Sequence, residues 1–205
     1  MPLRPHINTR EEFIAAVKEG YAVALDRLEH VVAPPGPKLL GEVHDLIFGK
    51  VLQPGWKFRD NTRPIETPKG EELCPHNQIK ERLQTIAGEC DRLPEKGNSE
   101  KAKLIAHFNA NLMELQPFKD DLKTPWVNRT VASVVLEAQL EHCFRSELIN
   151  RKIDAKKYEE ALHWNNEFNS DSKMISVVKE MAGKGYRLHR LDDYRSKDPS
   201  PEHEH

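Results

Sequence analysis

The sequence has few cysteines, no long apolar run and no excess of charge of either sign. Its three cysteines, Cys74, Cys90 and Cys143, form no C-x-x-C pair and show no His/Cys spacing suited to zinc. We therefore expect partly buried, reduced cysteines in a cytoplasmic protein. No stretch approaches the roughly 18 apolar residues that a bilayer span requires, and the start lacks the apolar segment of a secretory signal, so we expect no membrane association.

The charge balance bears on which partners the chain can have. Lys and Arg number 31 and Asp and Glu number 33, which gives a formal net charge of −2. A protein that binds a nucleic-acid backbone normally carries a strong basic excess, so we expect no nucleic-acid partner. The sequence also lacks the phosphate-binding G-x-x-x-x-G-K-[ST] and G-x-G-x-x-G patterns and the catalytic H-E-x-x-H and G-x-S-x-G patterns.

What the sequence does contain is helical periodicity. Apolar residues recur at steps of three and four along most of the chain, which predicts amphipathic helices. The expected helices span residues 11–31, 38–51, 77–93, 98–115, 125–144 and 154–168, and a last helix begins at Ser170 or Asp171 and is closed by Gly183 or Gly185. We expect Asn98 or Ser99 to cap the fourth of these helices.

One segment interrupts the helical pattern. Residues 52–76 contain four prolines and two glycines, which exclude a continuous helix and allow a short hairpin or an ordered loop. We therefore predict an all-α fold with one short β-hairpin. Residues 1–190 should form a single helical domain, and the polar residues 191–205 should form a disordered tail.

The stretch 104–136, LIAHFNANLMELQPFKDDLKTPWVNRTVASVVL, places a polar loop between two apolar helices. This arrangement resembles the Fic (Fic/Doc) family, whose helix–loop–helix presents the motif H-P-F-x-[DE]-G-N-G-R-x-x-R. The segment GEVHDLIFGKVLQPGWKFRDNTRPI at 41–65 resembles the family's I-H-x-x-L-F…W-A-G-x-x-R segment. Residues 154–181 resemble its paired C-terminal helices, so the similarity covers roughly residues 10–185. The resemblance implies a mainly helical core with a hairpin flap over the substrate.

The resemblance also implies a chemistry. In Fic enzymes the motif histidine is the general base that takes a proton from a target Ser, Thr or Tyr hydroxyl, which then attacks the α-phosphate of ATP. The acid of the motif holds Mg²⁺. In this sequence Pro117 and Phe118 match the motif, and Asp120 stands at the position of the metal-binding acid. Gln116 stands where the histidine belongs, and a glutamine amide cannot accept a proton near pH 7.

The phosphate-binding half of the motif is altered as well. Residues 121–128 replace the Gly-Asn-Gly turn, which puts a carboxylate and bulky side chains where an anion must approach the backbone. Arg129 matches the first arginine when an insertion is allowed before it, and Ala132 aligns with the second. The candidate phosphate-binding residues are therefore Lys119, Asn128 and Arg129.

These departures predict a degenerate motif and a pseudo-enzyme or protein-interaction module that is not competent for ordinary AMP transfer. A partner protein would add a strand to the edge of the flap, at Arg63, Ile65 and Thr67. The alternative is a divergent transferase that uses ATP and Mg²⁺ with another base, such as His107 or Asp121. A third alternative is a toxin-like member that an antitoxin controls.

The first helix contains a further similarity to the family. Residues 15–20, with Glu19 followed by Gly20, resemble the family's inhibitory [ST]-x-x-x-E-[GN] pattern, with Ala15 in the place of the hydroxyl residue. Since the second motif arginine is also missing, we interpret Glu19 as a surface charge.

Overall fold

The structure is a computed structural model that describes residues 9–31, 34–52, 58–60, 72–91, 93–119, 126–144, 151–152, 155–168, 170, 172–184 and 186–187. In chain order its elements are α1 (Arg10–Leu28), α2 (Pro37–Phe48), the 3₁₀ turn η1 (His76–Gln78), α3 (Ile79–Gly88), the 3₁₀ turn η2 (Leu93–Glu95), α4 (Asn98–Leu115), α5 (Trp126–Phe144), β1 (Arg151–Lys152), α6 (Ala155–Phe168), α7 (Ser172–Lys184) and β2 (Tyr186–Arg187). The predicted all-α class is confirmed.

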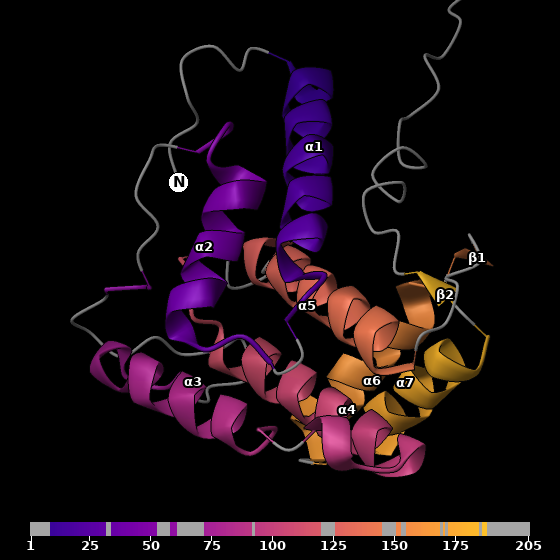
Figure 1. The fold of residues 1–205 in the computed structure, drawn as a ribbon. Helices are drawn as coiled ribbons and strands as arrows, with labels where there is room; N and C mark the ends of the chain where they lie inside the picture. The colour runs from indigo at the N-terminus through magenta and orange to yellow at the C-terminus, as the bar shows by residue number, and fades with distance from the viewer. Residues whose placement is uncertain are drawn as a thin grey trace, which may run out of the picture.

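Helices that are adjacent in the sequence pack as pairs on either side of the central helices α4 and α5 (Figure 1). Helices α1 and α2 pack against each other at one end of the molecule, and α6 and α7 pack against each other at the other end. Helices α4 and α5 lie between these two pairs, α5 against α1 and α4 against α7.

Helix α1 begins with a capping box and crosses α2 at a glycine. The Thr9 hydroxyl accepts from the Glu12 N–H, while the Glu12 carboxylate accepts from the Thr9 N–H, both at 3.1 Å. Further along, a Cβ on Gly20 would lie 2.4 Å from the carbonyl oxygen of Leu46 and 2.5 Å from that of Ile47. Only glycine allows the two helix backbones to approach this closely.

The core centres on α5, in which every residue from 130 to 140 is buried. One buried polar group ties three helices together there. The Asn109 amide on α4 donates to the Ala132 carbonyl of α5 at 2.9 Å, and the Tyr158 hydroxyl of α6 donates to Asn109 Oδ1 at 2.6 Å. Because Asn109 and Tyr158 are fully buried, each needs the other's hydrogen bond.

Two details differ from the sequence prediction. The N-cap of α4 is Gly97, not Asn98 or Ser99, and no side chain caps this helix. Strands β1 and β2 form a short parallel pair, Arg151 opposite Tyr186, that no sequence pattern indicated. A two-residue strand is too short to show an alternation of apolar and polar side chains, so this pair could not be predicted.

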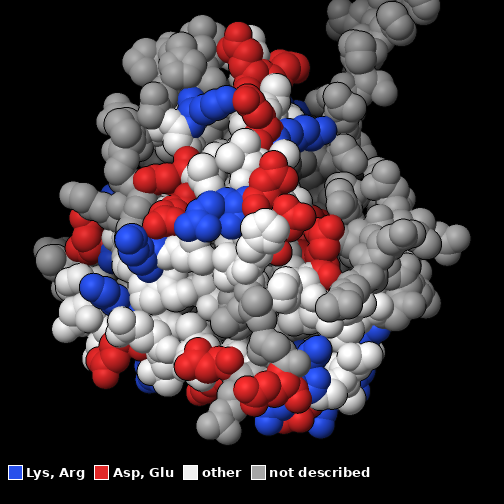
Figure 2. Space-filling view, viewed as in Figure 1, with Lys and Arg blue, Asp and Glu red and all other residues white. Residues whose placement is uncertain are grey.

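Within the described ranges, none of the helices is both long and apolar enough to cross a membrane. The face shown in Figure 2 has acidic and basic side chains interspersed, in line with the near-zero net charge. The residues of the predicted tail, 191–205, lie outside the described residues.

Candidate functional site

The candidate site is the segment between α4 and α5, residues 116–129, which we call the motif loop. The structure describes residues 116–119 and 126–129 of it. Gln116 follows the last residue of α4 and has left-handed backbone angles, φ 42° and ψ 62°, while its N–H still donates to the Leu112 carbonyl at 3.2 Å. A left-handed residue other than glycine costs about 1–2 kcal/mol, so contacts elsewhere must hold the chain in this turn.

Arg59 provides those contacts. Its side chain comes from the segment after α2 and is only 5% exposed. Nε donates to the Gln116 carbonyl at 3.0 Å, and Nη2 donates to the carbonyls of Leu115, at 3.3 Å, and Cys74. The guanidinium thus caps the end of α4 and also joins the backbone on either side of residues 61–71.

The backbone around Arg59 reinforces the same junction. Its N–H donates to the Pro117 carbonyl at 2.8 Å, and Phe58 forms an antiparallel bridge with Phe118. Burial lowers the pKa of Arg59 from its usual value, but an arginine stays charged at neutral pH. A permanent positive charge therefore faces the carbonyl end of α4, where the helix dipole favours it.

Asn128 fixes the motif loop from the other side. Its Oδ1 accepts from the Phe118 N–H at 2.9 Å, and its Nδ2 donates to the Phe118 carbonyl at 3.0 Å. The side chain is 2% exposed and is the third residue of α5 as described. Asn128 thus pairs with the Phe118 backbone as a neighbouring strand would, and its amide joins the first turn of α5 to the motif loop.

A row of aromatic rings lies beneath the motif loop. His44 stacks on Phe118 with ring centroids 4.6 Å apart and planes inclined by 23°. The row continues through the contacts Phe58–Phe118, His44–Phe48, Phe48–Trp126 and Phe13–Trp126, with centroids 5.2–5.7 Å apart. These contacts tie α1, α2 and the start of α5 to the loop.

His44 is the titratable group in this row. It is 4% exposed, and its Nδ1 lies 3.6 Å from the Asp45 carboxylate. Burial lowers the pKa of His44, although the Asp45 carboxylate opposes this effect. We therefore take the ring as neutral at pH 7, and its role in the structure is to pack against Phe118.

The predicted site residues fall into two groups. Gln116, Lys119, Asn128 and Arg129 are described and lie at the two ends of the motif loop; Lys119 is exposed and Arg129 is half-buried. Asp120, Asp121, Arg63, Ile65 and Thr67 lie outside the described residues. Among the described residues no group of three or more His, Cys, Asp or Glu side chains could hold a metal ion.

Two further residues from the sequence predictions are described. His107, one candidate for a replacement base, lies on α4 and is 47% exposed, with Nε2 3.3 Å from a Glu89 carboxylate oxygen. Its nine-residue separation from Gln116 corresponds to roughly 13 Å along the helix axis. Glu19 is 61% exposed and forms an ion pair with Lys50 at 2.5 Å, as a surface charge should.

Arg59 is not among the residues predicted from the sequence, although its side chain donates three hydrogen bonds at the site. A signal was present, because Arg59 falls at the arginine of the W-A-G-x-x-R pattern to which residues 54–59 correspond. Its contacts join segments that are far apart in the sequence, and no local pattern reveals such contacts.

These features define a helical domain in which an arginine and an asparagine fix the loop between two central helices. The N-terminal Fic domain of a VirB-translocated Bep effector from Bartonella quintana superposes with a TM-score of 0.62 at 15% identity, over 96% of this chain and 94% of that one. A Fic-domain structure from the same organism with bound ADP gives 0.60 at 16%, over 93% and 92%. BepC from Bartonella tribocorum with bound AMPPNP gives 0.57 at 16%, over 88% and 90%.

The chain therefore has the fold of a Fic domain, and the resemblance in its sequence is confirmed at the level of fold. No protein-family model and no curated protein matches the sequence.

Proposed function

We propose that this Fic-fold protein is a pseudo-enzyme that serves as a protein-interaction module and does not carry out ordinary AMP transfer. The observation that carries the proposal is Gln116. By the resemblance in sequence it stands where the family has its histidine; in the structure it directly follows α4, and Arg59 donates to its carbonyl. Its amide has no basic nitrogen, so a target hydroxyl would find no general base at this position.

The environment of Gln116 supports the same proposal. Its Oε1 is buried and accepts no hydrogen bond from the described part of the chain. On the other side of the motif loop, the Asn128 amide is already bonded to the Phe118 backbone through both its oxygen and its nitrogen. The Asn128 side chain therefore serves a structural role here.

The proposed partner surface is the flap edge at Arg63, Ile65 and Thr67. Its support lies in the residues that flank it. Arg59 joins the backbone before this segment to the Cys74 carbonyl after it, so both ends are anchored beside the motif loop. A segment anchored at both ends is suited to pairing with a partner chain as an added strand, because less entropy is lost on binding.

Calorimetry and a transfer assay test this proposal. The wild-type chain should transfer no labelled AMP from Mg-ATP to itself or to proteins of a lysate. Gln116→His should also remain inactive, because the altered turn at 121–128 and the missing second arginine persist. Gln78→His, at an exposed position on η1, is the matched control for a new histidine. Transfer by the wild type, or Mg-ATP binding that Arg129→Ala removes, would contradict the proposal.

The alternative is a divergent Fic-type transferase acting on a protein hydroxyl. The observation that favours it is that two of the similar Fic domains hold AMPPNP and ADP. In that case Asp120 would hold Mg²⁺, and Lys119 and Arg129 would contact phosphate. Asp120→Asn would then abolish transfer, whereas in a pseudo-enzyme it would leave partner binding unchanged.

A further inference from the structure

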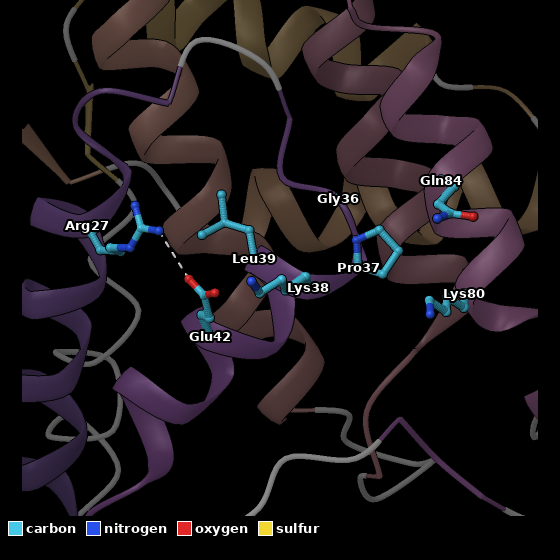
Figure 3. A pocket seen from close by; sticks show the side chains of 8 residues that line it. All are labelled: Arg27, Gly36, Pro37, Lys38, Leu39, Glu42, Lys80 and Gln84. Atoms are coloured by element: carbon cyan, nitrogen blue, oxygen red, sulfur yellow. Dashed lines mark hydrogen bonds and ion pairs between the residues drawn. The ribbon is translucent and has the colours of Figure 1, made fainter.

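A recess lies away from the motif loop, between the start of α2 and the start of α3 (Figure 3). Its volume is about 430 Å³, which is within the range of small-molecule sites. It is lined by Arg27, Gly36, Pro37, Lys38, Leu39, Glu42, Lys80 and Gln84. Three helices contribute to it, since Arg27 comes from α1 and Lys80 and Gln84 come from α3.

The charges in this recess do not balance. It is lined by three cationic side chains and one carboxylate, Glu42, which leaves a net charge of +2. Glu42 Oε2 is bonded to Arg27 Nη2 at 3.1 Å, so the arginine and the carboxylate neutralise each other. Lys38 and Lys80 have no hydrogen bond or ion pair with the described residues.

The recess is separate from the candidate site. Glu42, which lines the recess, and His44, which contacts Phe118, are two residues apart on α2 and therefore lie on nearly opposite sides of the helix. A ligand in the recess would therefore meet neither Gln116 nor Arg129.

We propose that this recess binds the phosphate group of a small phosphate monoester. A phosphate carries a charge of about −1.5 to −2 at pH 7, which matches the net charge of the recess, whereas a single carboxylate would neutralise only about half of it. Lysine is a common phosphate ligand because its three donors can rotate toward the oxygens. Pro37 and Leu39 supply apolar wall for the organic part of the ligand.

Calorimetry at low ionic strength, with phenyl phosphate, inorganic phosphate and acetate as probes, tests the site. Phenyl phosphate should bind more tightly than inorganic phosphate, and acetate should give no saturable heat. Lys38→Gln and Lys80→Gln should each weaken phenyl phosphate binding about tenfold. Lys103→Gln is the matched control, because Lys103 is exposed on α4 outside the recess and its side chain forms no ion pair with the described residues.

Amide NMR locates the bound probe. Shifts at Leu39, Lys80 and Gln84 on addition of phenyl phosphate would support the site. Three results would overturn it: no saturable binding, an equal loss in Lys103→Gln, or a loss caused by Arg129→Gln in place of the two lysine variants. Because none of these readouts involves AMP transfer, the site and the pseudo-enzyme proposal can fail independently.

Discussion

Replacement of Arg59 by methionine should destabilise the whole domain. Methionine has an unbranched side chain about as long as the aliphatic part of arginine, so it keeps the apolar packing. It loses the hydrogen bonds to the carbonyls of Leu115, Gln116 and Cys74. A hydrogen bond from a charged donor contributes about 1.5–3 kcal/mol, and water entering the opened site offsets part of the loss. We therefore expect a decrease of about 3 kcal/mol in the free energy of unfolding, which lowers Tm by roughly 6–12 °C in a chain of this size.

Thermal unfolding followed by circular dichroism measures this effect. Arg82→Met, at an exposed position on α3, is the matched control and should leave Tm within about 2 °C of wild type. Arg59→Lys should fall between the two, because an ammonium group cannot reach three carbonyls as the guanidinium fork does. If Arg59→Met unfolds at the temperature of the Arg82→Met control, Arg59 does not hold the motif loop.

Three further predictions concern the packing around the site. Gly20→Ala should cost about 1–3 kcal/mol in urea unfolding, because its Cβ would lie 2.4 Å from a carbonyl oxygen of α2, whereas Gly88→Ala, with open space around it, should cost nothing. Tyr158→Phe should cost about 1–3 kcal/mol, since it leaves Asn109 Oδ1 buried without its donor; an unchanged urea midpoint would refute this. Burial lowers the pKa of His44 in the folded chain below its ordinary 6.5, so as pH decreases the unfolded chain takes up this proton before the folded chain does, and the free energy of unfolding should fall below about pH 6.5. His44→Leu should make that fall less steep, and an equal slope in both chains would contradict the prediction.

The helices could be predicted from the sequence because their stability is local. The apolar spacing that places Leu104, Phe108 and Leu112 on one side of a helix is the same spacing that brings Phe108 and Leu112 of α4 into the core. The ends of helices were less predictable. Asn98 is a good capping residue by type, yet the extended backbone occurs one position earlier, at Gly97, and Asn98 is already helical.

For the candidate site, the sequence allowed us to predict which positions belong to the motif loop, but not which residues contact one another there. Gln116 and Asn128 were identified from motif spacing, and both lie at the motif loop. Their actual contacts depend on residues distant in sequence: Arg59 is 57 positions from Gln116, and His44 reaches Phe118 from α2. Such contacts follow from how the helices pack, which periodicity alone does not specify.

Amide NMR of the wild-type chain during a titration with Mg-ATP tests the central claim most directly. On our proposal the motif loop has lost the turn that binds phosphate, so the amide signals of Phe118, Lys119 and Arg129 should stay in place at millimolar Mg-ATP. Saturable shifts at these amides that disappear in Arg129→Ala, but persist in the lysine variants of the recess, would contradict the account.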